Sequence, residues 1–351
     1  MKKKWMIYGA NGYTGRLIAK QARERGLKPV LAGRNKAGIA AIAAETGFDS
    51  VVFDLEDTAA LNRALQGISM VLHCAGPFSA TSQPMIEACL KNGCHYLDIT
   101  GEISVFTNAH KRSDEAAHAD IVLMPGVGFD VVPTDCLAAK LVKALPAATS
   151  LVLAFEAGGD MSPGTAKTSV EGLAGGGCVR KHGKLEWVPL AWKTREIPFK
   201  HGKRLAVTIP WGDVFTAYIS TGIPDIEVYM AAPPSSIMQM KRLRMLKPLL
   251  TMHWVQNLMK KRIEKSVTGP EVHERQNSQM QIWGEAGTAN GRSVSAWMTT
   301  PNGYDITVTA SLGIVEYLLE HDVEGGFYTP SLLMGADYAA SLPGVTMQFN
   351  S

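Results

Sequence analysis

Three glycines near the start of the chain restrict its fold more than any other feature. Gly9, Gly12 and Gly15 lie between a short apolar run, Lys4–Ala10, and a helical pattern, Tyr13–Arg25. In a strand–turn–helix unit, the first glycine permits the tight turn, the second lets the backbone approach a pyrophosphate, and the third lets the helix pack against the sheet. The helix N-terminus then offers N–H groups and a positive dipole end to phosphates. This context predicts a dinucleotide-binding turn, and a purely structural loop is the alternative.

Short apolar runs alternate with helical patterns through the first half of the chain. This alternation predicts an α/β fold, a Rossmann-type doubly wound parallel sheet. The expected strands are Lys4–Ala10, Pro29–Gly33, Ser50–Asp54, Met70–Cys74, Tyr96–Ile99 and Ile121–Met124. The expected helices are Tyr13–Arg25, Lys36–Thr46, Ala59–Leu65, Gln83–Asn92 and Ile103–Ala117.

The pattern changes after about Pro146, where strand-like segments follow one another without regular crossover helices. We expect strands at Leu151–Glu156, Leu205–Ile209, Val214–Ile219 and Ile226–Ala231, and a hairpin of Asn277–Glu285 with Arg292–Thr299 around Asn290-Gly291. Such an order predicts a second, α+β domain on a mixed sheet, for substrate binding or dimerisation. The expected domains are 1–146 with 304–351, and 147–303.

Composition narrows the classes of function. A net charge of +3 is too small to indicate a nucleic-acid partner. The five cysteines are odd in number and lack C-x-x-C spacing, so we expect reduced thiols in the cytoplasm and no metal site. The apolar run Trp5–Tyr8 is too short for a signal peptide, and no run is long enough to cross a bilayer.

The segment Ser235–Lys265 is basic and helical in pattern. Methionines at positions 238, 245, 252 and 259 recur every seven residues, and Pro248 is expected to kink or divide the segment. We favour a core or subunit-contact stripe with a solvated basic face, which would suit a homodimer. A peripheral membrane or carrier-protein contact is the alternative.

The end of the second expected strand indicates which dinucleotide binds. NAD sites usually place a carboxylate there for the ribose hydroxyls, but this chain has Arg34, which can pair with a 2′-phosphate. We therefore predict NADP, with a solvated loop arginine as the alternative. Asp54 is placed for the adenine amino group or as a helix cap. The expected cofactor contacts are Gly9, Asn11, Gly12, Tyr13, Thr14, Gly15, Gly33, Arg34, Asn35, Asp54, Leu55, Ala75, Gly76 and Pro77.

Segments spread over nearly the whole chain resemble the saccharopine dehydrogenase-like NADP-binding family, in particular its trans-acting enoyl reductase branch. They are Gly9–Gly15, Ala32–Asn35, Cys74–Phe78, Tyr96–Glu102, Pro125–Asp135, Gly269-Pro270 with Glu274-Arg275, Trp283–Glu285, Thr300–Tyr304 and Gly326–Pro330. The resemblance implies an NADP-binding Rossmann domain and a mixed-sheet second domain. It also implies that the C-terminal helices, Tyr304–Asp322 and Ser331–Ser341, return to the first domain. It does not imply saccharopine chemistry.

Candidate catalytic groups follow the fifth and sixth expected strands. Asp130 could bond the carboxamide of the cofactor or transfer a proton, and Asp98, Thr100 and Glu102 should face the same cleft. Each could instead cap a turn or helix, and for Asp135 capping is the favoured interpretation. In the second domain, Ser162–Thr168 could present N–H groups, Thr165 and Lys167 to an anionic substrate, or form an ordinary capped helix. Glu274 and Arg275 could line a pocket or form an ion pair.

These observations predict an NADP-dependent oxidoreductase that transfers a hydride to or from a small or acyl-chain substrate. A non-catalytic NADP sensor or scaffold is the alternative. A third hypothesis is an enoyl reductase acting in trans on a carrier-bound or lipid substrate, with the segment 235–265 as its docking surface.

Overall fold

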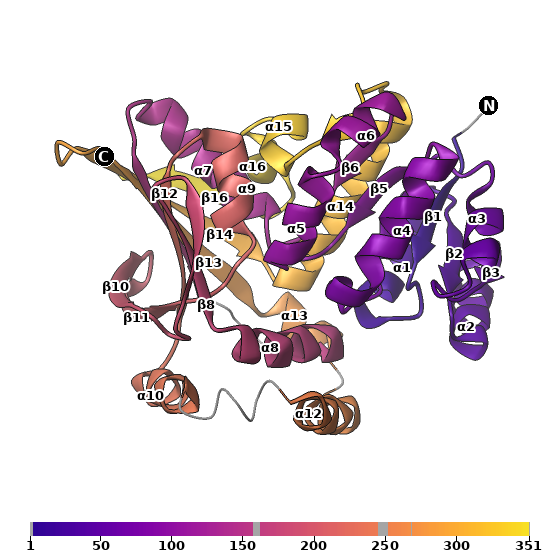
Figure 1. Cartoon of the computed structure of the whole chain (residues 1–351), viewed down its shortest axis with the longest axis horizontal. Coiled ribbons are helices and arrows are strands. Elements are labelled where there is room, and N and C mark those ends of the chain that lie inside the picture. Colours follow the sequence, from indigo (N-terminus) through magenta and orange to yellow (C-terminus); the bar gives the residue numbers. More distant parts are fainter. Residues whose placement is uncertain (1–2, 157–161, 245–251, 268, 351) are drawn as a thin grey trace. The chain divides into compact units, whose positions relative to one another are not determined.

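The computed structural model describes residues 3–156, 162–244, 252–267 and 269–350 (Figure 1). They divide into two compact units. The first unit comprises Met1–Asp130 and Ile306–Leu333, and the second comprises Val131–Asp305 and Met334–Ser351.

The first unit alternates strands and helices as predicted. Its strands are β1 Trp5–Tyr8, β2 Val30–Gly33, β3 Ser50–Val52, β4 Met70–His73, β5 His95–Asp98, β6 Val122–Met124 and β15 Gly326–Phe327. Its helices are α1 Tyr13–Glu24, α2 Lys36–Thr46, α3 Thr58–Leu65, α4 Phe78–Asn92, α5 Ile103–His110, α6 Ser113–His118 and most of α14, Gly303–Glu320.

Within the described residues, seven strands form one parallel sheet in the order β15-β6-β5-β4-β1-β2-β3. The chain runs outward from β1 through β2 and β3, then crosses back to β4 on the other side of β1. This order is that of a Rossmann sheet, extended by β15, and the expected fold class is confirmed. The strand order reverses between β1 and β4, which is where open α/β sheets bind ligands.

Two helices of this unit differ from the prediction. Helix α4 begins at Phe78 rather than Gln83, and Pro84 lies inside it. Proline is typical of the first turn of a helix, and a start at Gln83 would place Pro84 there. The single helix expected at Ile103–Ala117 is divided into α5 and α6, on either side of Lys111 and Arg112.

The second unit is built on a mixed sheet, as expected. Its strands are β7 Ser150–Glu156, β8 Gly177–Lys181, β9 Lys184–Val188, β10 Thr194–Phe199, β11 Gly202–Thr208, β12 Asp225–Ala231, β13 Gln279–Gly287, β14 Ser293–Pro301 and β16 Thr346–Phe349. Its helices are α7 Val132–Ala144, α8 Pro163–Gly175, α9 Asp213–Thr221, α10 Pro234–Leu243, α12 His253–Ser266, α13 Val272–Gln276, α15 Pro330–Met334, which straddles the boundary, and α16 Tyr338–Ser341.

In the described residues the main path of this sheet is β10-β11-β12-β7-β13-β14-β16, with β8 and β9 branching from β12. Only the β12–β7 pair on this path is parallel. Strand β10 also lies against β13 and β14: Trp283 packs with Ile197 and Phe199, and the Trp297 indole donates a hydrogen bond to Pro198 O at 2.6 Å. The sheet therefore curls over its own aromatic core.

The predicted strand Val214–Ile219 is wrong, because these residues lie in helix α9. Val, Phe, Thr, Tyr and Ile are typical of strands, but here Val214 to Ala217 are buried in a helix that packs against α7. The divisions between units also differ from the predicted domains. Helix α7 packs against β13 and β14, and β16 pairs with β14, so both belong to the second unit.

The basic segment forms two helices, α10 and α12. Met245 and Pro248 lie outside the described residues, and the side chains of Lys167, Thr168 and Lys265 are likewise not described. Among the described helices, none combines the length and apolar character needed to cross a membrane.

Candidate functional site

The glycine turn joins β1 to α1 at the carboxyl edge of the first sheet. Gly9 has a φ of +81°, and its N–H donates to Ala32 O at 2.8 Å. A Cβ on Gly9 would lie 2.8 Å from the backbone nitrogen of Ala75, and a Cβ on Gly15 would lie 2.3 Å from Gly9 O. Both positions therefore require glycine. Gly12 precedes α1 and has no side chain to cap the first turn of that helix.

Asn11 connects the turn to the second strand. Its side chain fills the space beside Gly33 and Gly38, where added Cβ atoms would lie 3.1 and 3.0 Å from it. Asn35, in contrast, is the N-cap of α2, and its side chain accepts a hydrogen bond from the N–H of Gly38 at 2.9 Å. The structure thus gives Asn35 a structural role beside the one predicted.

The side chain of Arg34 is exposed just after β2, and it makes no ion pair within the described part of the chain. Asp54 is also exposed, and its Oδ1 accepts from Glu56 N at 3.1 Å. The cap of α3 is Asp57, so the alternative proposed for Asp54 does not apply. Leu55 is buried, with only 7% of its surface exposed.

The loop Cys74–Pro77 follows β4 and contains a cis Gly76–Pro77 bond. The side chains of Thr81 and His73 hold it in place. The hydroxyl of Thr81 donates to Ala75 O at 2.6 Å, and it lies 3.0 Å from Nε2 of His73. Because Thr81 has a single hydroxyl proton, His73 Nε2 must be the donor to it. Burial lowers the pKa of His73 to about 3, so the ring is neutral at physiological pH.

The carboxylate of Glu102 binds the N-terminus of helix α4, which precedes it in the chain. Its two carboxylate oxygens accept hydrogen bonds from the N–H groups of Phe78 at 2.9 Å and Ser79 at 2.7 Å, in the first turn of α4. An anion at a helix N-terminus is stabilised by the helix dipole. Glu102 was predicted as a catalytic group, and this geometry gives it a second role in positioning α4 and the loop before it.

Asp98, at the end of β5, is the centre of a buried hydrogen-bond network. Its Oδ1 accepts from the N–H groups of Thr100 at 2.9 Å and Gly126 at 3.0 Å, and its Oδ2 accepts from the hydroxyl of Tyr96 at 2.6 Å. Burial raises the pKa of Asp98 to about 7 in spite of these bonds. Asp98 therefore joins the loops that follow β5 and β6.

The loop after β6 places Asp130 over the residues that follow β5. The N–H of Phe129 donates to the Thr307 hydroxyl of α14 at 3.0 Å, and a Cβ on Gly128 would meet the same threonine at 2.9 Å. The Asp130 carboxylate then packs on Gly101, where a Cβ would lie 2.7 Å from Oδ2. Burial first, and the charge of Glu102 second, raise the pKa of Asp130 to about 7.

The turns after β1, β2, β4, β5 and β6 thus bring together the predicted glycines, Thr100, Glu102 and Asp130 at one edge of one sheet. His73 and Thr81 were missed by the sequence analysis. A histidine at the end of a buried strand gives no local sign of its partner eight residues later. The bond from the Tyr96 hydroxyl to Asp98 gives Tyr96 a structural role.

Candidate residues of the second unit have structural partners. Ser162 caps α8 by accepting from Thr165 N at 3.2 Å, and Tyr304 bonds to both Ser162 and Thr165. Arg275 pairs with Asp305 at 3.0 Å, while Glu274 closes a capping box at α13. Asp135 accepts a hydrogen bond from Ser220. The predicted capped helix after Ser162 is therefore present.

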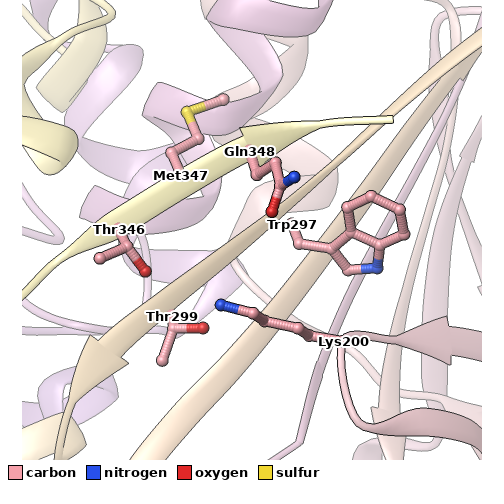
Figure 2. Close-up of a pocket in the computed structure, with 6 residues that line it drawn as sticks. All are labelled: Lys200, Trp297, Thr299, Thr346, Met347 and Gln348. Atoms are coloured by element: carbon pink, nitrogen blue, oxygen red, sulfur yellow. The ribbon is translucent and has the colours of Figure 1, made fainter. Parts of the chain in front are cut away.

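A small cavity in the second unit, about 170 Å³, opens at the edge of the mixed sheet (Figure 2). It is lined by Lys200, Trp297, Thr299, Thr346, Met347 and Gln348, and Lys200 extends across it towards Thr299. The Thr299 hydroxyl already donates to Gln281 at 3.1 Å. No group of His, Cys, Asp or Glu side chains in the described residues has a metal-binding arrangement.

Comparison with known proteins shows what this chain is similar to. Residues 5–124 match the family described as the saccharopine dehydrogenase NADP binding domain. The yeast saccharopine dehydrogenase (L-Glu forming) from Saccharomyces cerevisiae, solved in its apo form, has the same fold: the TM-score is 0.69 at 12% identity, covering 99% of this chain and 100% of that one.

Curated relatives match over a shorter region. A saccharopine dehydrogenase-like oxidoreductase of Rattus norvegicus is 28% identical, over 37% of this chain and 35% of the relative. A trans-acting enoyl reductase of Mycobacterium ulcerans is 30% identical, over 37% of this chain and 33% of the relative. These matches cover about a third of each relative. Residues 5–124 of this chain are thus similar to the saccharopine dehydrogenase NADP-binding domain.

Proposed function

We propose that this protein is an oxidoreductase that binds NADP(H) and exchanges a hydride with a small or acyl-chain substrate. The observation that carries the proposal is the turn at Gly9–Gly15, where backbone atoms occupy the places that Cβ atoms would take. A pyrophosphate can approach such a turn closely, and it meets the positive end of α1. The turn therefore fits the diphosphate of a dinucleotide.

The residues around the turn would hold the rest of the cofactor. Exposed Arg34, with no carboxylate at the end of β2, suits a 2′-phosphate better than two free ribose hydroxyls. The loop Ala75–Pro77 is at the correct end of β4 for the second ribose and the nicotinamide. Bound NADPH supplies a hydride and, as NADP⁺, can accept one.

Asp130 and Thr100 would act on the substrate side. A carboxyl group with a pKa of about 7 can hold or release a proton at physiological pH, and Asp130 has this property at the edge of the sheet. Asp98 and Glu102 would position it, because they bind the backbone of the adjoining loops.

The substrate class rests on the relatives. A trans-acting enoyl reductase among them suggests an acyl substrate. A location in the cytoplasm stays a prediction, because a relative from Arabidopsis thaliana is named as probably mitochondrial.

Cofactor choice can be tested by titrating NADPH and NADH against the fluorescence of the wild-type protein and Arg34→Ala. We expect tighter binding of NADPH, and Arg34→Ala should lose roughly 1–3 kcal/mol of that preference. Lys28→Ala is the matched control, because Lys28 is an exposed cation near the opposite end of β2. Equal affinity of the wild type for both cofactors would contradict the role of Arg34.

A screen of NADPH oxidation with imines, enoyl thioesters and ketones tests turnover. Oxidation with one class would identify the substrate class. Tight NADPH binding without turnover of any of them would instead favour a cofactor sensor or scaffold.

A further inference from the structure

Positive charge is concentrated in one stretch of the second unit. Residues 234–266 contain eight Lys or Arg and a single Glu, whereas the whole chain has a net charge of only +3. The remainder of the chain is therefore net acidic. A protein that is basic only in its overall composition would have its positive charges spread over the chain. Their concentration here indicates a polyanionic partner for this stretch.

Helix α12 presents an apolar and basic face to solvent. Trp254 and Leu258 are four residues apart, so they lie on the same side of the helix, and each has 63% of its surface exposed. The exposed cations Lys261 and Arg262 follow on the next turn of that side. Val255, Met259 and Ile263 lie on another side and are partly buried, while α12 packs against α8. The Trp254 side is therefore left over after packing.

Helix α10 repeats the arrangement. Met238 is 53% exposed, and the exposed cations Lys241 and Arg242 follow it by three and four residues. The adjacent residue, Ile237, lies on a different side of the helix and is buried with Ala191 and Val207. In Figure 1 both helices lie below the mixed sheet, at the same end of the second unit.

A further exposed tryptophan adjoins α10. Arg244, which follows this helix, donates hydrogen bonds to the carbonyls of Leu190 and Ala191, so the next residue, Trp192, lies near the end of α10. Trp192 is 46% exposed, and Met252 at the start of α12 is 45% exposed. We call Trp192, Met238, Met252, Trp254, Leu258 and the neighbouring cations the basic apolar surface.

We propose that the basic apolar surface binds the face of a membrane that contains anionic lipids. Trp, Leu and Met side chains enter the boundary between headgroups and acyl chains, while Lys and Arg pair with lipid phosphates. A membrane with anionic lipids explains both the apolar and the basic character of the surface. A second copy of the chain would bring two strongly positive surfaces together, and a nucleic acid would leave Leu258 and Met238 without a role.

The membrane binding can be measured by sedimentation with phosphatidylcholine vesicles, with and without phosphatidylserine. We expect the full chain to bind only the mixed vesicles, less strongly as salt rises. Lys261→Glu with Arg262→Glu, and separately Trp254→Ala with Leu258→Ala, should each weaken binding by about tenfold or more. The blue shift of tryptophan emission on binding should decrease in Trp254→Phe, although that variant still sediments with vesicles.

Two control variants keep the comparison matched. Phe349→Ala removes an exposed aromatic side chain from β16, and Lys181→Glu with Lys184→Glu reverses two exposed cations of the β8–β9 hairpin. Both should bind vesicles like the wild type.

Binding to neither kind of vesicle, or equal binding to both, would overturn the proposal. So would a dimer that Trp254→Ala with Leu258→Ala converts to a monomer, because a second copy would then cover this surface. Retention on an acidic acyl carrier protein without vesicle binding would overturn it as well. NADPH binding should be unchanged in all these variants, which separates this test from that of the proposed function.

Discussion

In the glycine turn of the first unit the closest approaches join backbone to backbone, whereas those around the second sheet more often join backbone to side chain. At Gly9 and Gly15 an added Cβ would meet atoms of Ala75 and of Gly9 itself. At Gly284, in β13, it would meet the side-chain ends of Leu137 and Leu141 from α7. Backbone cannot move without displacing strands, but a leucine can change rotamer.

This difference separates a turn built for a ligand from a sheet packed for stability. In the first unit, the glycines keep the carboxyl ends of β1 and β4 close together, so a bound molecule meets main-chain atoms. In the second unit, Gly284 makes room for α7 on one face of the curled sheet. Substitutions at these glycines should therefore differ in how much they destabilise the fold and in whether they weaken cofactor binding.

The largest effect is expected for Gly15→Ala. Its Cβ would lie 2.3 Å from Gly9 O and 2.9 Å from Ala10 Cα, so the turn and α1 must move apart. We expect the free energy of unfolding in urea to fall by roughly 3 kcal/mol, and NADPH binding to be lost. Gly172→Ala is the control, because nothing lies within 4 Å of its added Cβ in α8. Normal NADPH affinity in Gly15→Ala would refute the close approach.

Local chemistry explains which parts of this fold could be predicted. The turn at Gly9–Gly15 and the strand–helix alternation depend on residues that are close together in the sequence, so the parallel sheet could be predicted. Arg34 lies directly after its strand, and its exposure could be expected. Strand β15 could not, because Gly326–Phe327 is only two residues long and pairs with a strand two hundred residues earlier.

The parts that failed depend on distant partners. Residues 214–219 have the composition of a strand, yet packing against α7 and the stop at Gly222, with a φ of +72°, make them a helix. The structural role of Glu102 was likewise not predictable, because its partners are the N–H groups of Phe78 and Ser79, more than twenty residues earlier. No local sequence pattern predicts a hydrogen bond between residues so far apart in the chain.

A smaller effect is expected from the carboxyl groups of the first unit. Between about pH 4 and 7, Asp130 would ionise in the unfolded chain but keep its proton in the folded one, because its pKa is raised from 3.8 to about 7. The unfolded state then binds fewer protons, so the free energy of unfolding should fall as pH rises through this range. Because Asp130 is only partly buried, we expect about 1–2 kcal/mol of this dependence to disappear in Asp130→Asn.

A carboxylate of the second unit provides the control for that measurement. Lys140 holds the pKa of Asp337 below its usual value, so its contribution to stability is lost only at pH values below about 4. Asp337→Asn should therefore leave the slope between pH 4 and 7 unchanged. An unchanged slope in Asp130→Asn would show that this carboxyl group ionises normally in the folded protein.

The smallest effect is expected for Gly284→Ala, the counterpart of Gly15→Ala in the second unit. The added Cβ would lie 2.8 Å from Leu141 Cδ1 and 3.0 Å from Leu137 Cδ2, and both are the ends of flexible side chains. We expect a loss of about 1 kcal/mol in the free energy of unfolding, with NADPH binding unaffected. In the double variant with Leu141→Val, the loss should be less than the sum of the two single losses, because the shorter side chain makes room for the methyl group. A loss as large as that of Gly15→Ala would mean that the backbone of α7 cannot yield either, and the contrast between the two units would then fail.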